Sequence, residues 1–238
     1  WVRGWLFTGF PWLVSGYSQV PASPLAGYAP LIGVYGVSSI VALIAAFLAW
    51  AALFAATWRL RAWTLAGILA VGIGGQALGG VNWTTPDGPP TSVALLQGNI
   101  PQDMKWRPEK TVATLETYAR MAAASPARLV VMPETALPLF EHQLPDEYRE
   151  ALISLGRQNE GDILAGLPTG SFDDAYYNSV ISFGVAPSQR YHKVHLVPFG
   201  EYIPLKAVWG WVIEVLHIPL SDFARGAVDQ RPLAIGGQ

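Results

Sequence analysis

Two stretches of the sequence place ionisable side chains in apolar surroundings, where they are suited to chemistry. In the first, residues 191–204, Lys193 stands at the end of a predicted short strand, and the Pro-Phe-Gly-Glu turn after it carries Glu201. A low-dielectric pocket strengthens the field of an ammonium on any oxyanion that forms near it. The alternative is a strand-end lysine that points into solvent and pairs loosely with Glu201, because most lysines lie on the surface.

The second stretch, residues 132–138, places Glu134 directly after a hydrophobic run and between two prolines. This is the carboxyl end of a predicted strand, where α/β proteins place their sites. Desolvation there is expected to raise the pKa of Glu134 toward the range useful for a general base. An ordinary loop glutamate is the alternative interpretation.

The elements that must position these residues follow an alternating pattern from residue 92 onward. Short apolar runs predict strands at 92–97, 128–132, 162–166 and 176–183, and helical spacing of apolar residues predicts helices at 108–124 and 146–158. Alternation of this kind indicates an α/β layered domain. Residues 207–216 form an apolar arm that carries Trp209 and Trp211, which is either a core helix or a loop that dips into a membrane.

The first part of the chain has a membrane-like composition. Residues 1–91 hold four charged side chains, Arg3, Arg59, Arg61 and Asp87, whereas the charged residues that remain all lie in 92–238. Two apolar runs are long enough to cross a bilayer, which needs about 20 residues. The predicted organisation is an aromatic interfacial segment at 1–29, a transmembrane helix at 30–58, a cytoplasmic turn at 59–62, a second transmembrane helix at 63–82, a linker at 83–91 and a domain at 92–238. An aromatic loop packed on the membrane helices is the alternative for 1–29.

Orientation and excluded functions follow from the charges. Positively charged short loops stay in the cytoplasm, so Arg59 and Arg61 predict that residues 92–238 lie on the extracytoplasmic side.

The formal net charge is −2 and basic residues do not cluster, which argues against nucleic acid as a partner. The sequence has no cysteine, Gly-rich phosphate loop or zinc-ligand spacing, so neither a metal nor a cofactor is expected.

Taken together, these motifs resemble those of the apolipoprotein N-acyltransferases, bacterial inner-membrane enzymes with a nitrilase-like domain. The resemblance covers essentially the whole chain and rests on residues 96–102 with Lys105 and Trp106, on 133–138, on 191–201, and on 3–12 and 16–19 in the membrane part. It implies transmembrane helices followed by an α-β-β-α sandwich, incomplete here, with a Glu-Lys-Cys triad.

The resemblance also implies roles for individual residues. Glu134 matches the general base, Lys193 the lysine that stabilises the tetrahedral oxyanion, and Glu201 a second glutamate near the site. Trp106 matches a tryptophan that the family needs, and Phe199, Trp209 and Trp211 are expected to contact substrate.

The implied reaction has two steps. A sulfur nucleophile takes an acyl chain from a membrane phospholipid as a thioester, and the N-terminal amine of a diacylglyceryl-cysteine apolipoprotein then accepts it. The expected location is the bacterial inner membrane, in a multi-pass protein whose nitrilase-like domain is periplasmic.

The sequence departs from the family in having no cysteine. The expectation is therefore a fragment truncated at both ends, inactive by itself, whose nucleophile lies beyond Gln238. Two other readings stay open: a membrane-tethered nitrilase-like amidase, and an inactive relic that binds lipid or lipoprotein.

Overall fold

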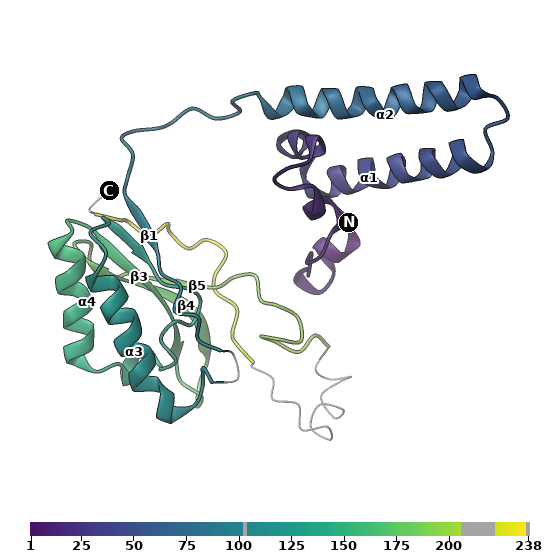
Figure 1. Cartoon of the computed structure of the whole chain (residues 1–238). Helices are drawn as coiled ribbons and strands as arrows, with labels where there is room; N and C mark the ends of the chain where they lie inside the picture. The colour runs from purple at the N-terminus through teal and green to yellow at the C-terminus, as the bar shows by residue number, and fades with distance from the viewer. Residues whose placement is uncertain (102–103, 206–221, 237–238) are drawn as a thin grey trace. The chain divides into compact units, whose positions relative to one another are not determined.

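The computed structural model describes residues 1–101, 104–205 and 222–236, which form two units that divide between Gly88 and Pro89 (Figure 1). This division falls inside the segment 83–91 that the sequence predicts as a linker. The arm at 207–216, with Trp209 and Trp211, lies outside the described residues.

The first unit begins with four short 3₁₀ helices and continues into two long α-helices. The 3₁₀ helices are η1 (Val2–Gly4), η2 (Leu6–Thr8), η3 (Ser15–Gln19) and η4 (Pro24–Tyr28), and the α-helices are α1 (Ala29–Leu53) and α2 (Trp58–Gly79). Within α1, Gly33 has φ +64°, a left-handed conformation that glycine adopts at little cost. Both α-helices are long and apolar enough to cross a membrane, and few of their side chains are buried within the unit.

The connection between α1 and α2 differs from the predicted turn at 59–62. The structure ends α1 at Leu53 and begins α2 at Trp58, so Arg59 and Arg61 lie in the first turn of α2. Thr57 sets this boundary, because its extended backbone and its hydroxyl, which accepts from the Leu60 N–H at 3.4 Å, cap the helix. The sequence interpretation placed the break at the charges, although arginine is a good helix former.

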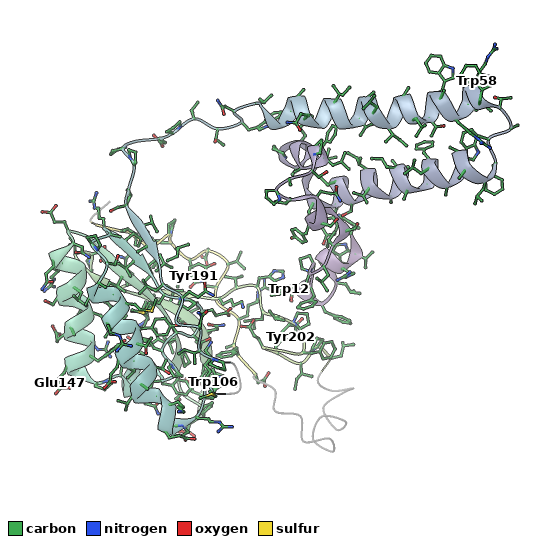
Figure 2. All side chains as sticks on the ribbon, viewed as in Figure 1. Trp12, Trp58, Trp106, Glu147, Tyr191 and Tyr202 are labelled. Carbon is green, nitrogen blue, oxygen red and sulfur yellow. The ribbon has the colours of Figure 1, made fainter. Side chains whose placement is uncertain are left out.

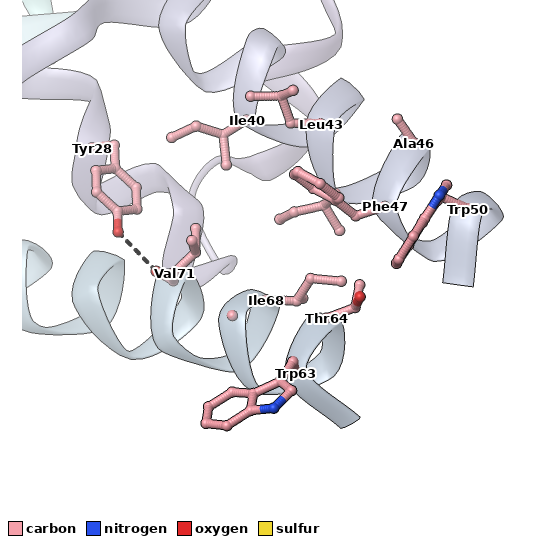
Figure 3. Close-up of a pocket in the computed structure, with 12 residues that line it drawn as sticks. Tyr28, Ile40, Leu43, Ala46, Phe47, Trp50, Trp63, Thr64, Ile68 and Val71 are labelled. Carbon is pink, nitrogen blue, oxygen red and sulfur yellow. Dashed lines mark hydrogen bonds between the residues drawn. The ribbon is translucent and has the colours of Figure 1, made fainter. Parts of the chain in front are cut away.

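Small residues allow η4 to pack closely on α2. A Cβ at Gly27 would come within 1.9 Å of the Gly75 carbonyl oxygen, and a Cβ at Gly75 would meet the Pro24 carbonyl oxygen at 2.3 Å. The Tyr28 hydroxyl donates to the Val71 carbonyl oxygen at 2.9 Å, beside an apolar groove of about 940 Å³ that α1 and α2 line (Figure 3). The glycines of α2 therefore include a point of close helix packing.

The second unit contains one five-stranded sheet in the order β1-β2-β3-β4-β5. Strands β1 (Val93–Leu95), β2 (Leu129–Val131) and β3 (Asp162–Gly170) run parallel, while β4 (Tyr176–Gly184) is antiparallel to β3 and to β5 (Arg190–His192). The carboxyl ends of β1, β2, β3 and β5 consequently lie at one edge of the sheet, and both Glu134 and Lys193 follow strands that end there.

Helices α3 (Pro108–Ala123) and α4 (Asp146–Gln158) cover one face of this sheet (Figure 1). Pro108 and the acidic residues Glu109, Asp146 and Glu147 stand in their first turns, where a missing N–H is tolerated and negative charge is favoured. The core lies between the helices and the sheet, and its largest fully buried side chains are Val130, Leu137, Leu152, Ile163, Leu167, Ile181 and Phe183.

The opposite face of the sheet carries apolar side chains that are exposed on β1 and partly exposed on the strands beside it. Val93 and Leu95 on β1 are 52% and 78% exposed. By register, Leu95 shares this face with Val131 and Leu164. The prediction of membrane-length helices followed by an α/β domain is confirmed, and the described residues supply one helical layer and one sheet of the expected sandwich.

Candidate active site

Glu134 stands on a tight turn at the carboxyl end of β2. The Met132 and Leu137 N–H groups donate to the Leu164 and Gly166 carbonyl oxygens, at 2.8 and 3.1 Å, so both ends of the turn are tied to β3. Leu137 is fully buried, whereas the Glu134 side chain is 57% exposed. The turn therefore has an apolar anchor and presents its carboxylate at the sheet edge.

Lys193 and Glu201 come from the segment that follows β5. The Lys193 N–H donates to the Asn178 carbonyl oxygen at 2.8 Å, which continues the β4–β5 pairing. Glu201 is held by its own turn: its N–H donates to the Val197 carbonyl oxygen at 2.9 Å, and its Oε2 accepts from the Val197 N–H at 2.8 Å.

These elements bring the three ionisable groups together. Lys193 Nζ lies 2.8 Å from Glu134 Oε1 and 2.9 Å from Glu201 Oε1. The Glu201 side chain is 12% exposed and that of Lys193 is 29% exposed, so the ammonium is partly shielded from water. An ammonium held between two carboxylates keeps its position, and the remaining exposed side is available to a developing negative charge.

The electrostatics of Glu134 correct one expectation from the sequence. Burial raises its pKa, as expected, but the hydrogen bond and charge of Lys193, with the hydrogen bond from Asn178, outweigh burial, so the pKa of Glu134 lies below its ordinary value. Burial lowers the pKa of Lys193, and its bonds to Glu134 and Glu201 outweigh that effect, so its pKa is raised. The resting site is therefore an ion pair in which the Glu134 carboxylate is ionised and able to accept a proton.

A second lysine, Lys105, contacts the main chain of the same turn. Lys105 Nζ donates to the Glu134 carbonyl oxygen at 3.0 Å. Burial lowers the pKa of Lys105, and the charge of Glu134 partly offsets this shift. Lys105 borders a polar cavity of about 310 Å³ whose other lining residues include Gln97, Asn99 and Tyr118. Space for a polar group thus exists directly beside Glu134.

Comparison with known proteins matches both units. Residues 1–47 match the model of the apolipoprotein N-acyltransferase N-terminal domain, and residues 92–209 match the carbon-nitrogen hydrolase model. An apolipoprotein N-acyltransferase of Nitrosomonas europaea is 53% identical over the whole of this chain. The chain belongs to the apolipoprotein N-acyltransferase family.

Other curated relatives agree with this assignment. Apolipoprotein N-acyltransferases of Chromobacterium violaceum and Methylococcus capsulatus are 45% and 43% identical, again over the whole chain. The chain spans about half the length of these relatives, 46% and 47%, and 47% of the Nitrosomonas europaea protein. Among solved structures, an N-terminal amidase covers 50% of this chain and 30% of its own, with 13% identity and a TM-score of 0.32; likeness at that level bears on neither fold nor function.

The structure brings some of the residues expected from the N-acyltransferase resemblance together and leaves others apart. Glu134, Lys193 and Glu201 form one hydrogen-bonded group. Trp106 follows Lys105 and is 52% exposed on the second unit (Figure 2), and Phe199 is 51% exposed on the turn that carries Glu201. Trp209 and Trp211 are outside the described residues, so their roles stay predictions.

Asn178, in the strand predicted at 176–183, is a further member of the site. Its main chain pairs with the neighbouring strands, and its side chain reaches both carboxylates. Asn178 Nδ2 donates to Glu134 Oε1, and to Glu201 Oε1 at 2.7 Å. The sequence signal is an amide in a strand predicted to be largely buried, at 176–183, because a buried polar side chain needs a hydrogen-bond partner.

Proposed function

We propose that this chain supplies the base and the oxyanion-stabilising group of an apolipoprotein N-acyltransferase. The reaction moves an acyl chain from a membrane phospholipid to the N-terminal amine of a diacylglyceryl-cysteine apolipoprotein. The observation that carries the proposal is the Lys193 ammonium, which joins Glu134 to Glu201 in a chain 53% identical to a relative of that name.

Glu134 acts as the general base and Lys193 stabilises the oxyanion. The exposed, ionised carboxylate of Glu134 removes a proton from the nucleophile, and the adjacent ammonium offers its field to the oxygen that becomes negative in the tetrahedral intermediate. Glu201 fixes the other side of Lys193 from its anchored turn. Trp106, which follows Lys105 in the chain, and Phe199, on the turn that carries Glu201, are both exposed and are assigned to contact with the acyl donor. Trp209 and Trp211 are assigned to substrate as well.

The chemistry proceeds through a thioester. A thiolate attacks the carbonyl carbon of the phospholipid ester, the bond from that carbon to the glycerol oxygen breaks, and lysophospholipid leaves with the proton that Glu134 held. The apolipoprotein amine then attacks the thioester, the carbon–sulfur bond breaks, and Glu134 accepts the proton that the amine loses. The two half-reactions share one site, which gives ping-pong kinetics.

The thiol must come from sequence outside these 238 residues, which contain no cysteine. We therefore expect the 238-residue chain alone to be inactive and the longer protein that carries it to be active. We place that protein in the bacterial inner membrane as a multi-pass protein. Arg59 and Arg61 at the start of α2 favour a cytoplasmic α1–α2 connection and a periplasmic second unit.

The test is acyl transfer by the longer protein, purified in detergent and supplied with a phospholipid and a diacylglyceryl-cysteine lipopeptide. Mass spectrometry should detect the N-acylated lipopeptide together with lysophospholipid. Hydrolysis of small amides without acyl transfer would favour the tethered amidase, and lipopeptide binding without turnover would favour the relic. The names of the relatives favour neither alternative.

A further inference from the structure

Asn178 is the buried centre of the group formed by Glu134, Lys193 and Glu201. It lies on β4, is 5% exposed, and its Nδ2 donates to Oε1 of both carboxylates. Lys193 Nζ donates to the same two oxygen atoms, at 2.8 and 2.9 Å. Each Oε1 therefore accepts one hydrogen bond from an amide and one from an ammonium.

This arrangement offsets the repulsion between the carboxylates of Glu134 and Glu201. Two carboxylates that share a site repel each other, and such repulsion ordinarily raises the pKa of one of them. One ammonium, Lys193, bonds to both of them, and a second, Lys105, donates to the Glu134 main-chain carbonyl oxygen. An amide NH₂ group adds two donors without adding charge, and because it only donates, the oxygens that it faces must accept.

The orientation of the amide follows from its neighbours. If the amide were flipped, its carbonyl oxygen would face two carboxylate oxygens, and the buried group would lose both bonds, which is costly. The main chain of Asn178 is fixed as well: it pairs with Pro168 of β3 and accepts from the Lys193 N–H at 2.8 Å. One residue thus touches all three members of the group.

We infer that Asn178 is a positioning residue for the acyl transfer, holding Glu134 and Glu201 on either side of Lys193 and keeping Glu134 in its proton-accepting form. This inference rests on the proposed function for its catalytic meaning. The titratable groups that face Glu134 among the described residues are Lys193, Glu201 and Lys105, and all three are unchanged in the variants below.

The first experiment measures the protonation of Glu134 in the 238-residue chain in detergent, by NMR titration of glutamate labelled with ¹³C at the side-chain carboxyl. Glu134→Gln assigns the signal. Asn178→Leu removes both donors with little change in shape, and the titration midpoint of Glu134 should rise by about one pH unit or more. Asn178→Asp should raise it further, because a third carboxylate joins the group.

The matched control is Asn159→Leu. Asn159 is also a partly buried amide whose Nδ2 donates twice, to the Ser125 and Ala127 carbonyl oxygens at 2.9 and 3.2 Å, away from the carboxylates. It should leave the Glu134 midpoint unchanged. If leucine at 178 prevents folding, Asn178→Ser replaces it, since a serine side chain is too short to bridge both oxygens.

The second experiment follows thioester formation in the longer protein against pH. In Asn178→Leu, the acidic limb of the profile should move upward with the NMR midpoint, and the rate should recover toward wild type at higher pH. A midpoint that stays at the wild-type value in folded Asn178 variants would overturn the inference. If the wild-type longer protein forms no thioester, the proposed function fails, while the titration still decides whether Asn178 controls the ionisation of Glu134.

Discussion

At Glu134, burial and charge act in opposite directions. Burial raises the pKa of this carboxyl, while Lys193 and Asn178 stabilise the ionised form and lower it more strongly. A base with a low pKa is weak in isolation, but here it is in place and ionised before substrate binds. Its ammonium partner, Lys193, is the group that we propose stabilises the oxyanion.

Replacing Glu134 by Gln tests its role as the base. The amide keeps the shape of the side chain and cannot accept the proton, so thioester formation in the longer protein should slow by about 10²- to 10⁴-fold. Stopped-flow or quenched single-turnover assays with a phospholipid donor would measure this. The control is Glu116→Gln on the exposed side of α3. A rate within a factor of two of wild type would remove Glu134 from the mechanism.

The pH dependence of the site follows from the two shifted groups. The pKa of Glu134 lies below its ordinary 4.5, so its contribution to stability is present above pH 4.5 and is lost as pH falls through the folded-state value. The pKa of Lys193 lies above its ordinary 10.5, so its contribution is fully present below pH 10.5 and is lost as pH rises through the folded-state value.

Lys193→Met should reverse the first of these shifts. Without the ammonium, the two carboxylates share the site with only Asn178 between them, so the titration midpoint of Glu134 should rise by about one unit or more. The melting temperature, measured across pH 3 to 8, should then begin to change above pH 4.5. Lys110→Met, at an exposed lysine on α3, is the control. An unchanged midpoint would show that Lys193 does not set the charge of Glu134.

At the scale of elements, the site depends on how closely the 133–136 turn approaches β3. Gly166 on β3 lies directly beneath this turn, and a Cβ there would meet the Pro133 carbonyl oxygen at 2.5 Å and the Thr135 nitrogen at 2.6 Å. Both contacts are with backbone, which has little freedom to move. The position of Glu134 relative to Lys193 therefore depends on residue 166, two strands from the lysine, being a glycine.

Gly166→Ala should displace the turn and separate Glu134 from Lys193. We expect thioester formation to fall by at least about 10²-fold, because a displacement of about 1 Å has an effect of that order. Overpacking should also lower the free energy of unfolding by about 1–3 kcal/mol. Gly67→Ala on α2, where a Cβ meets nothing within 4 Å, is the control. Wild-type activity in folded Gly166→Ala protein would contradict this account of the turn.

Several elements could be predicted because local chemistry determines them. Pro108 and Glu109 begin α3, and the amphipathic spacing of 146–158 coincides with α4. The ends of the membrane-length helices were harder to predict from sequence. The cap at Thr57 and the charge at Arg59, two residues later, are both plausible helix boundaries, and the structure uses the cap. The network around Asn178 depends on the β4–β5 register, and the lowered pKa of Glu134 depends on the distance to Lys193. Neither the strand register nor this distance can be read from one short stretch of sequence.

At the scale of the whole molecule, the chain consists of two units joined by an exposed segment. Residues 81–91 are exposed throughout, and Trp83, Pro86, Gly88, Pro89 and Pro90 occupy much of their length. Exposed backbone outside helices and strands is the preferred place for proteolysis.

Limited digestion with chymotrypsin should therefore cut first near Trp83. Mass spectrometry of early time points should show two products that separate the membrane-length helices from the α/β unit. A Trp83→Ala variant should delay this cut and leave later ones unchanged. First cuts inside α3 or β3 would show that the second unit is less well folded than its core indicates.

Two backbone hydrogen bonds hold the main chain at Lys193 and Glu201 independently of the side chains nearby. The Phe223 N–H donates to the Glu201 carbonyl oxygen at 2.8 Å, and the Gly226 N–H donates to that of Lys193 at 2.9 Å. Residues 223 and 226 thus hold the main chain at Glu201 and Lys193 from a later part of the sequence. Because both bonds join backbone groups, a change of the Phe223 side chain leaves its donor in place. Evolution can then vary the side chain at position 223 while Lys193 and Glu201 keep their positions.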